Sequence, residues 1–198
     1  MKRERIMKKI CALVLVLCLI FSLSACGGKK QEQKDKVDLE YYAKLGKIPE
    51  AEYTLGADVD TVTNELKAKM AEADKRPAEE DEEEFYFQVV EGKNNVLLDN
   101  GTVDYYYSKS DKDKGIASIV SFDTSYGFKL GTVISEVKNS FHNIKFAEQP
   151  IDETNTSYGV YIANGTALTA QFDGVVISFA FQDNQLFATS ICYEDWTN

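Results

Sequence analysis

Residues 164–193 read NGTALTAQFDGVVISFAFQDNQLFATSICY, and this stretch decides the fold. Asn164-Gly165 and Asp173-Gly174 are two-residue hairpin signals, because both turn positions need a positive φ. Asp183-Asn184 supplies a third turn. Between the turns, apolar residues recur at every second position, as in strands with two different faces. The stretch therefore predicts a four-stranded antiparallel meander, with strands near 157–163, 166–172, 175–182 and 185–193.

The same layout occurs earlier in the chain. Tyr53-Thr54-Leu55-Gly56 recurs 75 residues later as Phe128-Lys129-Leu130-Gly131. After each copy, three apolar residues follow at i, i+3 and i+7, which is one stripe of an α-helix. The stripes are Val59, Val62 and Leu66 in the first copy, and Ile134, Val137 and Phe141 in the second. Asp58 and Thr132 lie at the expected helix starts, where short oxygen side chains can cap free N–H groups.

An earlier meander is predicted after the first stripe, with strands near 84–91, 94–99, 102–109 and 115–123. The sequence thus predicts an α+β protein made of two tandem repeats, residues 49–124 and 125–198. Each repeat is expected to be a helix followed by a four-stranded antiparallel β-meander, with the helix on one face of its own sheet.

Alternation along the last two strands separates two sheet faces. Phe179, Phe187 and Ile191 are predicted to pack under the helix stripe. The opposite face is expected to meet water or a partner, because no other amphipathic helix is long enough to cover it. Tyr161 is assigned to that face, and so is at least one residue of Tyr105-Tyr106-Tyr107. We predict Tyr161 and Tyr106 as binding residues, since tyrosine offers contact area at low rotamer cost.

The first 25 residues have the features of a targeting segment. Five basic residues and one acid precede an uncharged stretch, Ile10 to Phe21, which is too short for a permanent membrane span. Leu23-Ser24-Ala25-Cys26 follows, and this motif resembles the lipobox of bacterial lipoproteins. The resemblance implies that residues 1–25 are removed and that Cys26 carries lipid. It also implies a protein anchored to the bacterial cell membrane on its extracytoplasmic side.

Composition limits the partners. Once residues 1–25 are removed, 17 basic and 31 acidic residues remain, a net charge of −14. Nucleic-acid binding needs a basic face and is not expected. Cys192 would be the one free thiol left, so no internal disulfide is possible. Residues 26–48 are polar and are predicted to be a flexible tether between the lipidated Cys26 and the folded part.

The Leu-Gly-led helices, each followed by a meander, resemble the β-lactamase-inhibitor-protein-like fold and the related SmpA/OmlA outer-membrane assembly lipoproteins. The motifs that carry this resemblance are Leu55-Gly56 and Leu130-Gly131. It covers about residues 50–196 in architecture. The resemblance implies a non-catalytic role in binding an envelope or extracellular protein. The paired disulfides of the inhibitor family have no counterpart in this chain.

Signatures of zinc proteases, P-loops, nucleophile elbows and C-x-x-C redox sites are missing from the sequence. His142, the one histidine, lies where the second helix should end, a favourable place for it. The acidic run Glu79–Glu84 lacks the ligand spacing of a calcium loop and is predicted to be solvated. No enzyme activity, metal or cofactor is therefore expected. The alternatives left open are an envelope hydrolase with a carboxylate-based site, and partner binding at Glu79–Glu84.

Overall fold

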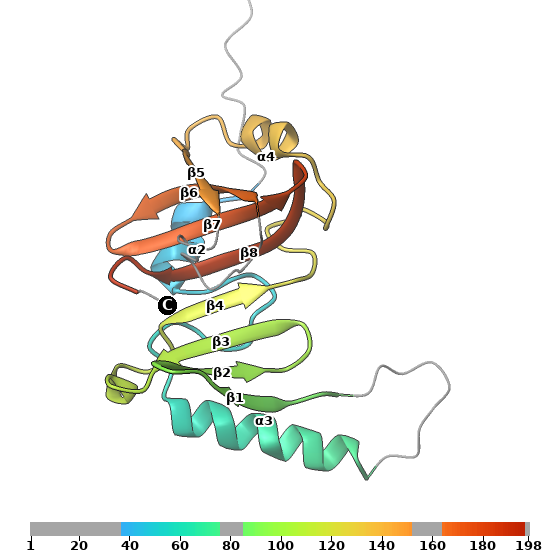
Figure 1. The fold of residues 1–198 in the computed structure, drawn as a ribbon, viewed down its shortest axis with the longest axis vertical. Helices are drawn as coiled ribbons and strands as arrows, with labels where there is room; N and C mark the ends of the chain where they lie inside the picture. The colour runs from blue at the N-terminus through green and yellow to red at the C-terminus, as the bar shows by residue number, and fades with distance from the viewer. Residues whose placement is uncertain (1–36, 76–84, 152–163, 197–198) are drawn as a thin grey trace, which may run out of the picture. The chain divides into compact units, whose positions relative to one another are not determined.

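The strands of the protein belong to one antiparallel sheet in a computed structural model, which describes residues 37–75, 85–151 and 164–196 (Figure 1). All of these residues lie in one unit of the chain, Asp35–Asn198. The strands are β1 (Gln88–Glu91), β2 (Asn95–Asp99), β3 (Val103–Ser108), β4 (Ser118–Ser121), β5 (Ala147–Ile151), β6 (Gly165–Phe172), β7 (Val175–Gln182) and β8 (Gln185–Tyr193). Their order across the sheet is β1-β2-β3-β4-β8-β7-β6-β5.

The prediction of two separate helix-plus-four-strand repeats is wrong, although the class is broadly α+β. The two meanders join through β4 and β8, where Ile119 lies opposite Ile191 and Val120 opposite Ser190. All four residues of β4 are buried. Pairing these strands removes two exposed edges, which a pair of separate sheets would have left open. We call this junction of β4 and β8 the seam.

The first strand of the second meander also differs from the prediction. The structure places it at β5, which pairs with β6 through partners such as Glu148 and Leu168. The predicted strand 157–163 lies outside the described residues. Pattern reasoning missed β5 because its sequence, AEQPI, is polar and contains Pro150. Proline is compatible with an edge strand, and β5 is the last strand of the sheet.

Three α-helices accompany the sheet in the described residues. They are α2 (Leu39–Leu45), α3 (Val59–Ala73) and α4 (Ile134–Ser140), and a short 3-10 helix, η2 (Lys112–Lys114), lies between β3 and β4. Asp58 caps α3 as predicted, by accepting a hydrogen bond from the Thr61 backbone N–H at 2.8 Å. By contrast, α4 is capped by Val133 without a side-chain bond, so the predicted cap at Thr132 is wrong.

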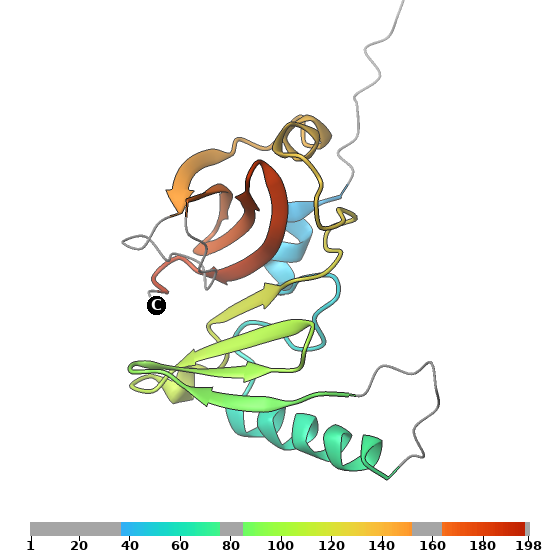
Figure 2. The same cartoon turned by 45° about the vertical axis from the view of Figure 1, so that its right-hand side comes forward.

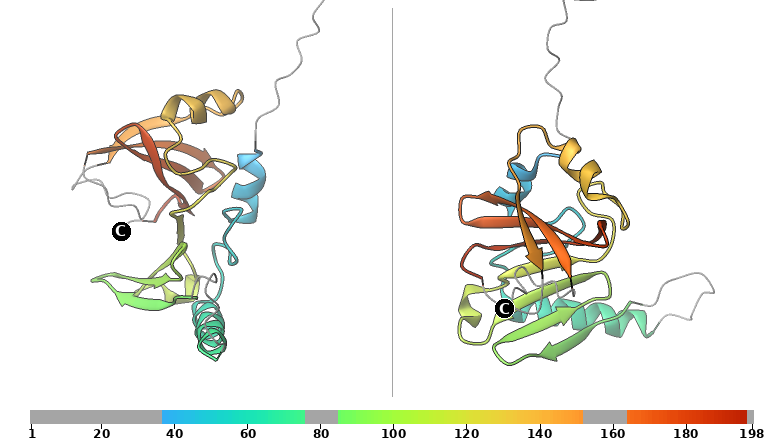
Figure 3. Two further views of the ribbon diagram at one scale, coloured as in Figure 1. Left: turned by 90° about the vertical axis from the view of Figure 1, so that its right-hand side faces the viewer. Right: turned by 45° about the horizontal axis from the view of Figure 1, so that its top comes forward.

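Helix α2 lies within the segment that was predicted to be a flexible tether, so that prediction is wrong for this part of the chain. Residues 26–48 were expected to be flexible, yet Leu39 and Ala43 of α2 are buried in the main core. Asp38 caps the helix by accepting from the Tyr41 N–H at 3.0 Å, and Gly46 ends it in the left-handed conformation. The folded part therefore begins about ten residues before position 49. Figure 3 shows α2 and α3 on the same side of the sheet.

The main core lies between this helix side and the sheet. The predicted helix stripes point into it, since Val62, Leu66 and Val137 are at most 1% exposed. The sheet contributes large side chains, including Tyr105, Ile119 and Phe179. Burying so many branched and aromatic side chains provides the main stabilisation of a chain with no disulfide in its described part.

The opposite side of the sheet, which we call the far face, is also buried over its central strands. Ser178, Ala188, Ser190 and Cys192 all lie there and are at most 2% exposed. The expectation that this face meets water is therefore wrong for β7 and β8. Figure 2 shows that β6, β7 and β8 curve more strongly than β1 to β3.

A β-bulge changes the predicted faces of β8. The pairing of β7 with β8 shifts between Ala180 and Phe181, so that Phe181 lies opposite Leu186. Leu186 takes the core position that the sequence assigned to Phe187. Phe187 is 38% exposed and contacts Phe122, with 5.8 Å between ring centroids. One extra residue thus reverses the predicted orientation of the start of the strand.

Candidate functional site

Strand β3 carries the three consecutive tyrosines and sends them to different faces. Tyr105 is fully buried on the helix side, where its hydroxyl accepts from the Glu52 backbone N–H at 3.1 Å. Tyr106 points to the far face and packs against its small cluster of buried residues. The prediction that at least one of these tyrosines points away from the helices is confirmed. The neighbours of Tyr106 on the same side of β3 are Asp104 and Ser108, because side chains alternate along a strand.

Asp104 forms an acid pair with Asp99, its direct partner on β2. The Tyr106 hydroxyl donates to Asp104 Oδ2 at 3.2 Å. Asp99 accepts from the Gly101 N–H at 2.7 Å and from the Gln88 side-chain amide at 2.8 Å. Both carboxyl oxygens of Asp99 thus accept hydrogen bonds from the adjacent turn and from β1, while Asp104 is 9% exposed.

Burial, and then the negative charge of Asp99, raises the pKa of Asp104 to about 7. The hydrogen bond from Tyr106 favours the charged form and opposes this shift, whereas a hydrogen bond to Asp99 adds to it. Asp104 therefore keeps its proton up to near neutral pH. The raised pKa of Tyr106 has burial as its main cause.

This spacing bears on the hydrolase hypothesis. Glycosidases hold their two carboxyl groups roughly 5 to 9.5 Å apart, to leave room for the sugar or a water. Asp99 and Asp104 are close enough to hydrogen bond with each other, so the pair does not fit that arrangement. No group of three or more His, Cys, Asp or Glu in the described ranges could hold a metal ion.

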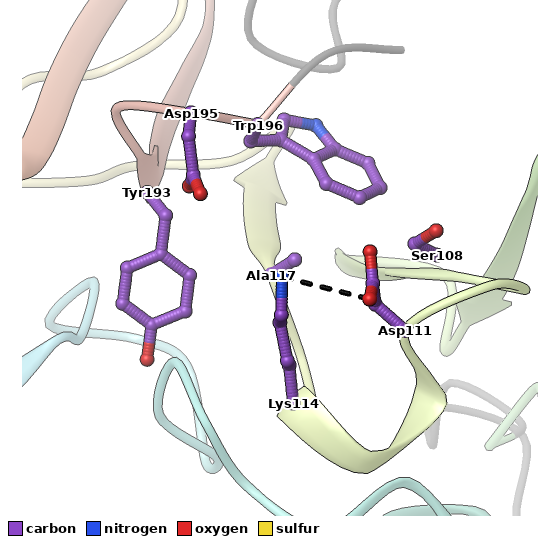
Figure 4. Close-up of a pocket in the computed structure, with 7 residues that line it drawn as sticks. All are labelled: Ser108, Asp111, Lys114, Ala117, Tyr193, Asp195 and Trp196. Carbon is purple, nitrogen blue, oxygen red and sulfur yellow. Dashed lines mark ion pairs between the residues drawn. The ribbon is translucent and has the colours of Figure 1, made fainter.

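A pocket of about 70 Å³ lies where the β3–β4 connection meets the end of β8. We call it the tail pocket. Figure 4 shows Asp195 and Trp196 entering it after β8, and Asp111 and Lys114 entering it from the β3–β4 connection. Its lining residues are Ser108, Asp111, Lys114, Ala117, Tyr193, Asp195 and Trp196.

Backbone hydrogen bonds fix the walls of the tail pocket. Tyr193 N–H donates to the Ala117 carbonyl at 3.2 Å, and Trp196 N–H donates to the Tyr193 carbonyl at 3.0 Å. Lys114 forms an ion pair with Asp111 at 3.5 Å, a separation at the loose end for such a contact. The indole N–H of Trp196 is buried and has no hydrogen-bond partner among the described residues. The lining residues therefore carry two carboxylates, one ammonium group and the indole of Trp196, whereas the ring of Tyr193 packs against the main core.

Strand β1 is the second candidate site, because one of its edges pairs with no other strand in the described part of the chain. All four of its residues are exposed, and Val89 and Val90 each show 42% of their surface. Tyr86, just before the strand, is 44% exposed. Gly92 N–H bonds to the Asn95 carbonyl at 2.9 Å, which fixes the register of the β1–β2 hairpin. By alternation from that pair, the N–H groups of Val89 and Glu91 point to the free edge.

The structure places the predicted site residues as follows. Tyr106 lies on the far face as assigned, but it is half-buried and its hydroxyl is engaged by Asp104. Tyr161, Cys26 and the acidic run Glu79–Glu84 lie outside the described residues. Cys192 is buried in β8, and burial raises the pKa of its thiol to about 12. Burial therefore disfavours its reactive thiolate form.

Sequence reasoning missed the acid pair and the tail pocket. The predicted strands 94–99 and 102–109 would place Asp99 opposite Thr102, whereas the longer loop in the structure pairs it with Asp104. No local pattern in the sequence indicates the tail pocket. Asp111 and Trp196 are distant in sequence and come close only because β4 pairs with β8 at the seam. No described helix is long and apolar enough to cross a membrane. Comparison with protein-family models, with curated proteins and with solved structures gave no match.

Proposed function

We propose that this chain is a lipid-anchored binding protein on the extracytoplasmic side of the bacterial cell membrane, and that it acts without catalysis. The lipobox-like motif ending at Cys26 supports the anchor. The exposed, unpaired edge of β1 supports the binding role and is the observation that carries it. The partner is an envelope or extracellular protein.

Strand addition is the mode of binding that β1 favours. An open edge presents N–H and C=O groups in the spacing of the next strand, so an extended segment can pair with it. Val89 lies on the helix side and Val90 on the far side, because their partners Leu98 and Leu97 point in those directions. Both side chains could therefore contact the added strand. Natural edge strands are usually protected by charge, proline or bulges, and here only Glu91 adds a charge to the strand.

Charge indicates the kind of segment that binds. The chain without its first 25 residues has a net charge of −14, so an acidic partner would be repelled and a basic one attracted. Lys109, a basic residue beside the strand, is already paired with Glu91 at 2.9 Å. We therefore propose an extended, basic segment of the partner protein as the added strand.

A pair of variants at one position tests this mode of binding. Val89→Pro removes the outward N–H of β1, whereas Val89→Thr keeps that N–H and the branched Cβ. In intact cells, a photo-crosslinker at position 90 should trap the same partner in the wild type and in Val89→Thr. Val89→Pro should reduce the trapped amount about tenfold or more.

A crosslinker in the β7–β8 turn, at Asp183, provides the background for this experiment. That turn is exposed and lies away from β1 in the strand order. Equal trapping at positions 90 and 183, or equal trapping in the Pro and Thr variants with the fold intact, would contradict strand addition.

The anchor has its own test. We expect Cys26→Ala to abolish palmitate labelling and to move the protein out of the membrane fraction, or to leave it as uncleaved precursor. Immunoblots of cell fractions, together with the labelling, measure both effects. Labelling that persists in the variant would show that the lipid is attached elsewhere or that the motif is incidental.

A further inference from the structure

Helix α2 is apolar on two opposite sides. Leu39 and Ala43 point into the main core and are at most 4% exposed. Tyr41 and Leu45 lie two positions further along, and two residues turn an α-helix by about 200°, so they point away from the core. Their side chains are 55% and 44% exposed. The outer side of a surface helix is usually polar, so this second apolar side is open to an apolar environment of its own.

The two exposed side chains form one small surface, which we call the α2 face. Tyr41 and Leu45 are four positions apart and are therefore neighbours on the helix. The Tyr41 ring packs edge-on against Tyr42, with 5.4 Å between the ring centroids. Tyr42 packs in the same way against the buried Tyr126, at 5.5 Å. The α2 face is thus held in place by the core of the protein.

The side chains beside the α2 face suit a boundary between lipid and water. Lys44 donates to Glu40 at 2.7 Å, so the two charges of the helix compensate each other. Both side chains are exposed and long enough to reach water or polar headgroups while the apolar pair is buried. The ring of Tyr41 is apolar and its hydroxyl is polar, and such residues gather at membrane interfaces.

The position of α2 in the chain indicates what covers this face. The helix begins 13 positions after Cys26, the residue that the proposed function anchors in the membrane. Even fully extended, this stretch reaches no further than about 45 Å. A contact that is too weak to bind a free protein becomes effective once a tether holds the two surfaces close. We propose that the α2 face rests in the lipid–water interface of the membrane and that this contact orients the sheet.

The charge of the chain is divided in the same sense. Residues 26–47 contain six lysines and four acidic residues, a net charge of +2. Residues 48–198 contain 11 basic and 27 acidic residues, a net charge of −16. A bilayer that contains anionic lipid attracts the first part and repels the second. Electrostatics therefore favours an orientation with α2 toward the membrane.

This orientation is compatible with strand addition at β1. Helix α2 packs against β6 and β7, whereas β1 is the strand at the other end of the sheet (Figure 1). A membrane contact at α2 thus leaves the β1 edge away from the bilayer, within reach of a partner. The inference rests on the proposed function for the lipid at Cys26, but it does not depend on how the partner binds.

Fluorescence quenching by lipid tests the contact. The lipidated full chain is reconstituted in vesicles of phosphatidylcholine with a minor fraction of phosphatidylglycerol, with or without nitroxide-labelled lipid as quencher. One fluorophore is attached through Lys44→Cys, beside the α2 face, and in a second sample through Lys93→Cys, in the exposed β1–β2 turn. Cys192 is buried and burial raises the pKa of its thiol to about 12, so it should not take the label.

We expect the nitroxide lipid to quench the label at position 44 at least about threefold more strongly than the label at position 93. Leu45→Gln should reduce the quenching at position 44 by about half or more, because it removes part of the apolar surface. Leu130→Gln is the matched control, since Leu130 is 48% exposed and lies in the loop before α4, and it should change nothing. Glutamine favours helices, so Leu45→Gln should keep the wild-type circular dichroism spectrum.

Flotation with the vesicles separates failure of this inference from failure of the anchor. Chains that float while both labels are quenched equally would overturn the contact at α2 and leave the lipid anchor in place. Quenching that Leu45→Gln leaves unchanged, or that Leu130→Gln reduces as much, would overturn it as well. Wild-type chains that do not float would contradict the anchor itself, and the contact that depends on it would fall with it.

Discussion

The seam and the β1 edge are parts of one sheet with opposite environments. At the seam, Ile119 and Ile191 face each other with no exposed surface, and Ser190 on the far face is buried as well. At β1, every residue is exposed and one side of the strand pairs with no other described strand. The difference indicates that the middle of the sheet serves stability. We propose that the edge is the part open to another protein.

The largest loss of stability is expected for a substitution at the seam. Ile191→Ala should lower the free energy of unfolding by about 2–5 kcal/mol, because it leaves a cavity between β4, β7 and β8. Urea denaturation of the full-length chain in detergent measures it. A loss below about 1 kcal/mol would mean that β8 is not buried on both faces as described.

Asp104 lies on β3, between the seam and the β1 edge, and should make the free energy of unfolding depend on pH. Its pKa is about 7 in the folded chain and near 3.8 when unperturbed, so the folded state holds the proton more tightly. Stability should therefore fall as pH rises from about 4 to 7, and then level off. Asp104→Asn removes the buried charge and keeps an acceptor for Tyr106. The variant should be about 1–3 kcal/mol more stable than the wild type at pH 8, with water screening part of the effect.

Asp123→Asn is the control for this pH series, because Asp123 is exposed and lies in the turn after β4. Denaturant midpoints at pH 4, 6 and 8 compare the two variants with the wild type. At pH 4 the Asp104 variant and the wild type should match. A constant difference at all three values would assign the effect to packing and not to the titration of Asp104.

The smallest effect is expected at the edge. Val89→Thr should change the free energy of unfolding by less than about 0.5 kcal/mol, because the side chain is exposed and Thr also favours strands. The same urea series as for Ile191→Ala gives the comparison on one scale. If the Val89 variant lost as much stability as the Ile191 variant, the edge would be part of the core and closed to a partner.

Local signals in the sequence predicted much of the second meander. Asp173-Gly174 and Asp183-Asn184 adopt positive φ at both positions, as their turns require. The alternation of apolar residues between these turns predicted which residues of β7, and of most of β8, point to each side of the sheet. These features depend on neighbours in the chain, so a single sequence contains them.

The features that the sequence did not reveal depend on distant contacts. The pairing of β4 with β8 joins residues about 70 positions apart, and alternation does not specify which strand pairs with which. Helix α2 is too short for a clear periodic pattern, and the packing of Leu39 and Ala43 on the sheet stabilises it. The bulge at Phe187 adds one residue and reverses a face. The tail pocket exists only because the seam brings Trp196 to the β3–β4 connection.

Amide hydrogen exchange at β1 tests the central claim most directly. In the free full-length chain, Val89 and Glu91 N–H groups point to the open edge and should exchange quickly, whereas that of Val90 bonds to β2 and should exchange slowly. Once the trapped partner is identified and added, the account predicts that Val89 and Glu91 become protected together, by about tenfold or more. A partner that binds tightly while both amides still exchange at the free rate would contradict strand addition at β1.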